Sequence, residues 1–245
     1  MDTLQRTIFI SDLHLAEDSQ EQTNTFLSLL NGIDETVDAL YILGDLFEYW
    51  IGDDIDTSFN RKIKSALKAV TSSMPVYFIW GNRDFLLGQS YFNETGIIHL
   101  PDEKRITLYG TPILLMHGDT LCLKDRVYQK SRRYMRNRLL QRLFLMMPFS
   151  FRERFAKSIR DKSARYINRT AQEIIDVTQE AVDERMIAHQ VLYLVHGHTH
   201  QKNIHIFELS GKEAKRIVLD SWHVAGNALV WYANGDYEMK TIPFC

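Results

Sequence analysis

The sequence predicts a mixed α/β fold whose core is interrupted by a helical insertion. Three observations favour this fold. Short apolar runs of strand length recur along the chain, helical patterns separate the first of them, and a long segment without glycine interrupts the series. The chain has 245 residues, of which 45% are hydrophobic. It is therefore long enough for a sizeable core in one large domain, or in one domain that carries an insert.

The first predicted elements alternate between strand and helix, which is typical of an α/β layered sheet. Near-continuous apolar runs that end at glycine or polar residues predict buried strands. These runs lie at 7–10, 39–43, 76–80, 113–116 and 191–195. Helical patterns at 21–30 and 60–71 separate the first three strands. After His200, antiparallel strands broken by turn residues are expected at 204–208, 216–219, 228–232 and 237–242.

The segment 124–190 predicts several helices. It contains no glycine and one proline, Pro148, which should separate one helix from the next. Its part 124–169 carries four lysines and eleven arginines against three acidic residues, a net charge of +12 in a chain of net charge −2. Such a block usually faces phosphates, nucleic acid or an acidic membrane, and a solvated helical face is the alternative. We expect a core of 1–123 plus 191–245 with a helical insertion at 124–190.

The composition excludes several classes of protein. The chain is too apolar for a disordered protein and has too few prolines and glycines for a fibrous one. Its two cysteines, Cys122 and Cys245, are too few for a disulfide framework and suit a reducing compartment. No signal peptide is visible, and no apolar run is long enough to span a bilayer. Phosphate-binding glycine loops, nucleophile elbows and the HExxH zinc motif are missing from the sequence.

Potential metal ligands follow each of the five predicted core strands. Because ligands gather beyond the carboxyl ends of strands in α/β sheets, we expect these groups to converge on one site. In chain order the groups are Asp12 and His14; Asp45; Asn82, Arg83 and Asp84; His117; and His196, His198 and His200. The remaining histidines are expected to be structural, hydrogen-bonded residues: His99, His189, His205 and His223.

The types of ligand indicate the chemistry. Carboxylates, imidazoles and one amide oxygen, without a thiolate, suit Mn²⁺, Fe or Zn²⁺. There are too many of them for one ion, and about enough for two ions that share a carboxylate. Paired ions clamp a phosphoryl group and activate a bridging hydroxide for in-line attack on phosphorus. The residues therefore predict two-metal hydrolysis of a phosphoester or a phosphoanhydride.

The order of these motifs resembles that of the calcineurin-like metallophosphoesterases, which carry Asp-X-His, Gly-Asp, Gly-Asn-X-Asp, His-Gly and Gly-His-X-His. The motifs occur in that order along 12–200. Longer stretches at 41–54, 81–88, 115–122 and 196–200 are similar to a branch of that family that acts in lipid A synthesis of Gram-negative bacteria. The resemblance implies an α/β (α+β) fold, a two-sheet sandwich flanked by helices with a helical cap inserted at about 124–190.

The resemblance also implies two Mn²⁺ ions bridged by Asp45. One ion would be held by Asp12, His14, Asp45 and His200. The other would be held by Asp45, Asn82, His117 and His198. Catalytic roles are implied for Asn82, Arg83 and His198. Substrate contacts are implied for Asn82, Arg83, Asp125, Ser163, Thr170 and His198, although members of the family often have polar or basic residues around the position of Thr170.

The implied reaction is attack of a metal hydroxide on the α-phosphorus of a UDP-linked diacylated glucosamine lipid. It would release UMP and 2,3-diacylglucosamine 1-phosphate. The implied location is the cytoplasmic face of the bacterial inner membrane, where the protein would bind peripherally. Neither nucleic acid nor an obligate protein partner is expected.

Arg83 departs from the wider family, in which a histidine often follows the asparagine. Arginine cannot act as a general acid at neutral pH, but it can clamp a phosphate through two parallel hydrogen bonds. A diphosphate suits that change because its leaving group needs little protonation. The alternative is that Arg83 only pairs with Asp84. The apolar stretch 143–151 is expected to line a chamber for acyl chains or to touch the membrane, and packing between helices is its alternative.

Two other functions remain open at this stage. A metallophosphoesterase of nucleic acids or nucleotides would explain the basic segment equally well, but the segment has an apolar stretch in place of exposed stacking aromatics. A metal-stabilised scaffold that binds membranes through its basic helices is the other reading. A phosphate-clamping arginine argues against it, because structural metal sites are usually closed.

Overall fold

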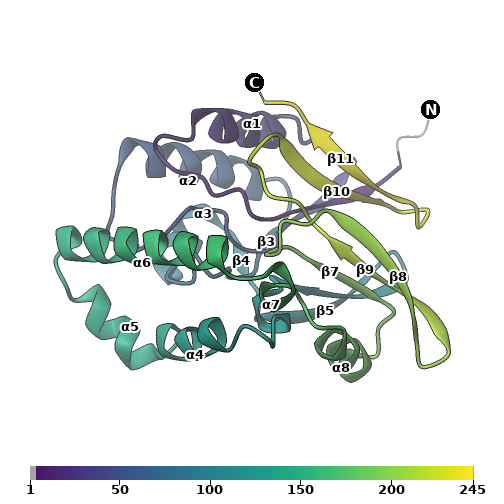
Figure 1. Ribbon diagram of the computed structural model, residues 1–245. Coiled ribbons are helices and arrows are strands. Elements are labelled where there is room, and N and C mark those ends of the chain that lie inside the picture. Colours follow the sequence, from purple (N-terminus) through teal and green to yellow (C-terminus); the bar gives the residue numbers. More distant parts are fainter. Residues whose placement is uncertain (1–3, 245) are drawn as a thin grey trace.

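Two β-sheets packed face to face form the centre of the protein, with helices on both outer sides (Figure 1). The computed structural model describes residues 4–244, without the side chains at 167, 168, 172 and 173. The strand order is β11-β10-β1-β2-β3-β4 in the first sheet and β5-β6-β7-β9-β8 in the second. The α/β (α+β) class and the two-sheet sandwich that the sequence predicts are confirmed.

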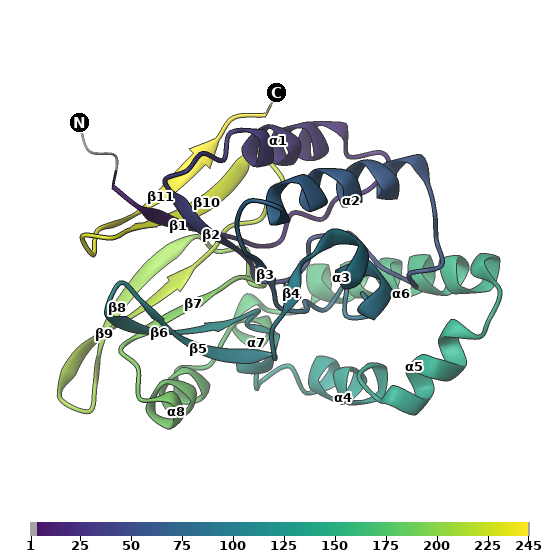
Figure 2. The same ribbon diagram turned by 180° about the vertical axis from the view of Figure 1, so that it is seen from behind.

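The first sheet is parallel except for its last two strands. Its parallel strands are β1 (Arg6–Ile10), β2 (Val37–Ile42), β3 (Val76–Phe78) and β4 (Ile98–His99). Its antiparallel strands are β10 (Gly226–Tyr232) and β11 (Tyr237–Ile242). Helices cover its outer face: α1 (Gln20–Asn31), α2 (Ser58–Thr71) and α3 (Gln89–Thr95) (Figure 2). The apolar faces of these helices, including Phe26 and Leu67, pack on the sheet.

The second sheet combines a parallel centre with antiparallel edges. Its strands are β5 (Glu103–Leu108), β6 (Thr111–Met116), β7 (Tyr193–His196), β8 (Asn203–Leu209) and β9 (Lys212–Val218). β6, β7 and β9 are parallel neighbours. The inner faces of the two sheets meet in a buried cluster that includes Phe9, Tyr41 and Val195. Helix α8 (Gln179–His189) covers the outer face, where Val182 and Met186 pack with Leu114 and Leu194.

The chain after His200 divides between the two sheets. The hairpin of β8 and β9 belongs to the second sheet, and the hairpin of β10 and β11 belongs to the first. Both hairpins are antiparallel, as the turn residues predict, but β9 also pairs in parallel with β7. The sequence did not indicate this division, because the partner of a strand depends on residues far away in the chain and local patterns do not identify it.

The helices of the predicted insertion differ in how they pack. They are α4 (Arg126–Met135), α5 (Arg138–Leu145), α6 (Phe149–Arg169) and α7 (Gln172–Ile175), followed by α8. α6 begins after Pro148, as the sequence predicts. α4, α5 and α6 extend to one side of the sandwich (Figure 1), and α4 and α5 contain no buried residue. α8, in contrast, packs on the core. The division into a core and a 124–190 domain stays a prediction.

Candidate metal centre

The side chains of the candidate centre lie on loops that follow β1, β2 and β3 of one sheet and β6 and β7 of the other. The expectation of convergence came from a rule for single open sheets, whereas here two sheets contribute. Direct contacts join their loops: the backbone N–H of His198 donates to Oδ2 of Asp12 (2.9 Å), and Nδ1 of His117 lies 2.8 Å from the carbonyl of Leu43. The two sheets therefore present their ligands to one place.

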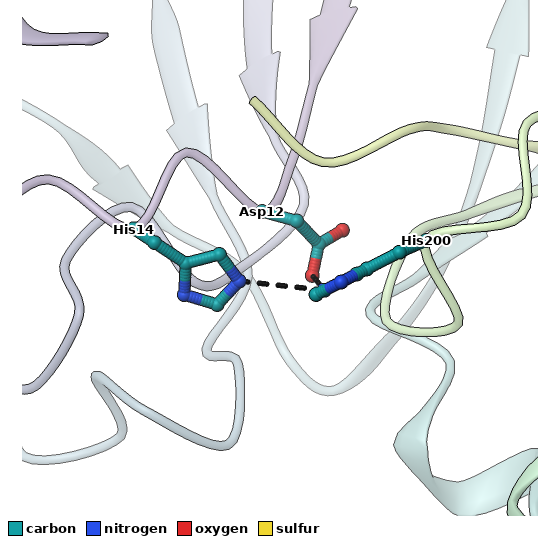
Figure 3. Close-up of side chains that lie close together, drawn as sticks. All are labelled: Asp12, His14 and His200. Atoms are coloured by element: carbon teal, nitrogen blue, oxygen red, sulfur yellow. Dashed lines mark hydrogen bonds and ion pairs between the residues drawn. The ribbon is translucent and has the colours of Figure 1, made fainter. Parts of the chain in front are cut away.

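Asp12, His14 and His200 form the first group of candidate ligands (Figure 3). The Nε2 atoms of His14 and His200 lie 3.3 Å apart, and Nε2 of His200 lies 3.3 Å from Oδ1 of Asp12. Oδ1 of Asp12 is buried and accepts no hydrogen bond, although Oδ2 accepts one from Ser11 (2.6 Å). A buried carboxylate oxygen without a donor is costly unless a cation neutralises it.

Asp45, Asn82, His117 and His198 form the second group. Oδ1 of Asn82 lies 2.9 Å from Nε2 of His117 and 2.8 Å from Nδ1 of His198. Oδ2 of Asp45 lies 3.8 Å from Nε2 of His117. Ligand atoms of Asp12, Asp45 and His117 all lie within 4.8 Å of one another, so the two groups are adjacent. All seven predicted metal ligands are thus brought together.

Hydrogen bonds and burial prepare the imidazoles for metal binding. The carbonyl of Leu43 lies 2.8 Å from Nδ1 of His117. A carbonyl can only accept, so Nδ1 carries a proton, and Nε2 is the nitrogen that faces the other candidate ligands. Burial, together with the charge of His117, lowers the pKa of His198 to about 4, which keeps this ring neutral near pH 7.

Asp45 acts electrostatically on both groups. Burial alone would lower the pKa values of His14 and His117, but neighbouring carboxylates outweigh it and raise both. Asp45 contributes to each of the two shifts, so its charge lies near both histidines. This position suits the bridging role that the sequence predicts for Asp45, and that role stays a prediction.

The backbone is strained where it carries these ligands. Five of the seven predicted metal ligands have positive φ angles: Asp12 (55°), His14 (52°), Asp45 (53°), His198 (70°) and His200 (56°). Residues other than glycine rarely adopt this region, and each such residue costs about 1–3 kcal/mol. Such strain gathers at functional sites, where the surrounding structure holds it in place. The backbone of these loops therefore keeps an unfavourable conformation that holds the ligand side chains in place.

Two glycines allow the loops to approach one another. Gly44 has φ of 90°, and a Cβ there would lie 2.7 Å from Nδ1 of His117. A Cβ at Gly197 would lie 2.1 Å from Oδ2 of Asp12. Neither position has room for a side chain, so these glycines are required by the close packing of the ligand loops.

The donor set fits a pair of divalent cations. It combines two buried carboxylates, four imidazoles and one amide oxygen, and the orphaned oxygen of Asp12 is aimed into it. No thiolate takes part among residues 4–244, where Cys122 is buried and burial raises the pKa of its thiol to about 12. This mixture of hard and borderline ligands suits Mn²⁺, Fe or Zn²⁺ without selecting one of them.

Glu48 is a residue of the centre that the sequence reasoning missed. Its carboxylate contacts Nδ1 of His14 (3.2 Å), the guanidinium of Arg83 (3.3 Å) and Nε of Arg160 (3.4 Å). Burial raises the pKa of Glu48, but its contacts with His14 and the two arginines outweigh this effect and lower it. The signal was present in Gly-Asp-Leu-Phe-Glu, where Glu48 follows Asp45 by three residues.

Arg83 and Asp84 have separate partners. The backbone N–H of Arg83 donates to Oδ1 of Asp45 (2.8 Å), and its guanidinium points to Glu48. Asp84 is fully buried and accepts hydrogen bonds from the backbone N–H groups of Leu46 (2.7 Å) and Gly81 (2.9 Å). Asp84 therefore holds two ligand loops together, and Arg83 is not occupied by pairing with it.

The predicted substrate residues lie on the helices beside the centre. Asp125 caps α4, where its Oδ1 accepts from the backbone N–H of Tyr128 (2.8 Å) and from the hydroxyl of Tyr166 on α6 (2.9 Å). Ser163 is half-buried on α6, and the hydroxyl of Thr170 donates to the carbonyl of Tyr166 (2.7 Å). Their contacts with substrate stay predictions.

The other histidines divide into two kinds. His99 stacks on Phe92 (ring centroids 5.0 Å apart), and His189 lies 3.0 Å from Glu103, as structural residues do. His196 is buried, and its Nε2 faces Arg216 (3.2 Å). His223 was expected to be a structural residue away from the site. Its ring instead lies beside the rings of His14 and His200, with centroids 5.9 Å and 5.7 Å apart. Nothing in the local sequence around His223 signals this position.

Comparisons with known proteins agree with this geometry. A family model for calcineurin-like phosphoesterases matches residues 5–202. A UDP-2,3-diacylglucosamine hydrolase of Photobacterium profundum is 44% identical over 230 residues, which cover 94% of each chain. A protein of the same name from Coxiella burnetii (strain RSA 331 / Henzerling II) is 44% identical over 237 residues, covering 97% of this chain and 98% of the relative.

The fold has a counterpart among solved structures. An archaeal phosphodiesterase aligns with a TM-score of 0.50 at 10% sequence identity, covering 97% of this chain and 100% of the other. At this low identity the likeness concerns the fold alone.

Proposed function

The chain belongs to the calcineurin-like phosphoesterase family, and from this premise we propose that it hydrolyses the diphosphate of UDP-2,3-diacylglucosamine in lipid A biosynthesis. The observation that carries the proposal is the convergence of seven oxygen and imidazole ligands from two sheets. The similarity of this chain to relatives named UDP-2,3-diacylglucosamine hydrolase extends over nearly the whole chain, and it includes helices α4–α6.

The ligand set would hold two ions. Asp12, His14, Asp45 and His200 would hold one, and Asp45, Asn82, His117 and His198 would hold the other. Two divalent ions bound there supply Lewis acidity at phosphorus and lower the pKa of the attacking water. We propose Mn²⁺ as the ion, because the family resemblance implies it and the donor set, which would accept Mn²⁺, Fe or Zn²⁺, is compatible with it.

Arg83 is placed to bind the diphosphate. Its guanidinium lies at the rim of the centre with 22% of its side chain exposed, and Glu48 orients it. A guanidinium in this position binds phosphate oxygens through two parallel hydrogen bonds. Asn82, which precedes Arg83, and His198, whose Nδ1 lies 2.8 Å from Oδ1 of Asn82, would contact the same phosphates.

The proposed reaction breaks one phosphoanhydride bond. The oxygen of water adds to the α-phosphorus and remains on UMP. The oxygen that bridges the two phosphorus atoms departs with 2,3-diacylglucosamine 1-phosphate. A phosphate is already a good leaving group, so no side chain must protonate it, and this suits an arginine at position 83.

The helices beside the centre offer an apolar surface for the acyl chains. Many large apolar side chains there are exposed: Leu139, Leu140, Leu143, Leu145, Met146, Met147, Phe149, Phe151, Phe155 and Ile159. Packing between helices accounts for few of them, such as Phe144 against Phe155 (ring centroids 5.5 Å apart). Exposed apolar area of this extent usually marks a binding surface.

We propose that the same helices hold the protein at the cytoplasmic face of the inner membrane. Exposed arginines on α5 and α6, including Arg138, Arg142 and Arg154, flank the apolar side chains. Basic and apolar residues together bind the surface of an anionic bilayer. No helix among the described residues is both long and apolar enough to cross a membrane.

The experiment is an assay of UMP release from UDP-2,3-diacylglucosamine, with Mn²⁺ and with EDTA. Bis-p-nitrophenyl phosphate and single-stranded DNA serve as comparison substrates. We expect metal-dependent UMP release with poor turnover of both comparison substrates. Turnover of the generic diester without UMP release would keep the metal chemistry and overturn the lipid substrate, and cleavage of the DNA would identify a nuclease.

A further inference from the structure

One face of α4 is fastened to the loops that carry the second group of metal ligands. Tyr128, Arg132 and Arg136 are spaced by four residues and share this face. The hydroxyl of Tyr128 and Nε of Arg132 both donate to Oδ2 of Asp119, each at 2.6 Å. The guanidinium of Arg136 donates to the carbonyl of Gly81 at 3.0 Å.

Asp119 joins α4 to the loop of His117. It follows that ligand by two residues and is 3% exposed. The guanidinium of Arg132 also donates to Asp102 (2.8 Å), so Arg132 links two carboxylates. A guanidinium keeps its charge at neutral pH, so the hydrogen bond from Arg132 to Asp119 is of the strong, charge-assisted kind.

Arg136 joins α4 to the loop of Asn82. It grips the carbonyl of Gly81, the residue directly before Asn82. Its guanidinium also lies over the rings of Trp80 (5.6 Å) and Phe85 (5.2 Å), which flank the same loop. Arg136 thus contacts the Asn82 loop on both sides of the ligand.

We propose that Arg132 and Arg136 are positioning residues for the metal ion held by Asn82 and His117. Among the described residues, neither guanidinium contacts a ligand atom. Arg132 would act through Asp119 and Arg136 through Gly81, which lie close to the ligands in the chain. The inference rests on the proposed metal-dependent function and deepens it, because it makes helix α4 part of the frame of the metal centre. α4 has no buried residue, so polar contacts attach it to the core: those of Arg132 and Arg136, and that of Gln129, whose side chain donates to the carbonyl of Asp119 (2.8 Å).

The test compares three single substitutions in the full-length protein. Arg132→Gln and Arg136→Gln remove the contacts. Arg133→Gln removes the same charge from an exposed neighbour on the same helix and is the matched control. Mn²⁺ binding is measured by titration calorimetry and by electron paramagnetic resonance, which distinguishes a single Mn²⁺ from a coupled pair.

We expect the Kd of one of the two Mn²⁺ ions to rise by about tenfold or more in the first two variants, since changes behind a metal ligand cost about 10–100-fold in affinity. The Kd of the other Mn²⁺ ion should stay as in the wild type. The Arg133→Gln variant should bind both ions with wild-type affinity. Turnover of bis-p-nitrophenyl phosphate should fall at low Mn²⁺ and recover at saturating Mn²⁺.

Wild-type binding separates the two hypotheses. A wild-type protein that binds no Mn²⁺ pair would contradict the proposed function itself. A wild type that binds two ions, with folded variants that bind them equally well, would overturn the inference alone, as would a loss of turnover that saturating Mn²⁺ does not restore. If circular dichroism shows that Arg132→Gln does not fold, Arg136→Lys is measured in its place. This variant keeps the cation over Trp80 but changes the hydrogen bond to the carbonyl of Gly81. A higher Kd for one Mn²⁺ ion would support the inference, and unchanged binding would overturn it.

Discussion

The metal centre and the helices α4–α6 hold their functional side chains in opposite ways. In the centre, Asp12 is fully buried, and a strained backbone holds five of the ligands. On the helices, apolar side chains project outward, and Met146 is 82% exposed. This difference fits the proposed function. Cleaving a phosphoanhydride needs atoms fixed within fractions of an ångström, whereas the acyl-chain binding that we propose for the helices would need exposed apolar area.

The two regions meet at charged side chains. Glu48 joins the first ligand group to α6 through Arg160, and Asp119 joins the second to α4 through Arg132. Asp119 is buried, so the loss of its partner on α4 would leave a costly unpaired charge. Helices α4 and α6 are therefore connected to the centre through ion pairs and hydrogen bonds.

The largest expected effect comes from removing a central ligand. Asp45→Ala should lower kcat/KM for UMP release by on the order of 1,000-fold, because both proposed ions lose a ligand. Metal content measured by mass spectrometry should fall with it. Asp236→Ala, an exposed carboxylate on a distant turn, is the control and should leave both unchanged. Wild-type turnover by Asp45→Ala would contradict the ligand assignment.

The second prediction compares two leucines. Leu114 on β6 is fully buried between the second sheet and helix α8, and Leu143 on α5 is 50% exposed. Leu114→Ala should reduce the free energy of unfolding by about 2–5 kcal/mol, and Leu143→Ala should change it by less than about 0.5 kcal/mol. Urea denaturation measures both. Equal losses of unfolding free energy would mean that Leu143 also packs in a core. The proposed difference between the buried core and the exposed helices would then be wrong.

The third prediction concerns the rim of the centre. Arg83→Ala should lower kcat by about 100-fold, the usual effect of removing one charge-stabilising donor. Metal content should stay intact, because only the backbone N–H of Arg83 contacts a ligand, Asp45. Arg83→Lys should recover part of the loss, since lysine keeps the charge without the bidentate geometry. Unchanged turnover in Arg83→Ala would remove this side chain from the reaction.

The smallest expected effect lies on the exposed helices. Met146→Ser should raise KM for the diacylated substrate by about threefold, because an open site provides only part of the transfer free energy of an apolar side chain. Turnover of bis-p-nitrophenyl phosphate, which has no acyl chain, is the internal control and should not change. A KM equal to the wild-type value would show that this side chain does not contact the lipid.

Much of the candidate centre was predictable from single residues. Asp12, His14 and Asp45 follow short apolar runs that predict buried strands, and polar residues at strand ends indicate a site. Glu48 and Asp119 were harder to assign, because a carboxylate two or three residues from a ligand is common and its partners, Arg160 and Arg132, lie on distant helices. His223 gave no signal, since its neighbours His14 and His200 are brought to it only by folding.

The sequence by itself determined most of the strands, the ligand types and the basic, glycine-free insertion, because periodicity, composition and local turn chemistry are properties of short segments. It did not indicate β4, which has two residues, or β5, whose residues are largely polar. Only the tertiary structure decided that the ligand loops come from two sheets, that β8–β9 and β10–β11 separate, and that one face of α4 grips the centre. These features depend on contacts between residues far apart in the chain. Such contacts form only when the sheets pack, and local sequence patterns carry no record of them.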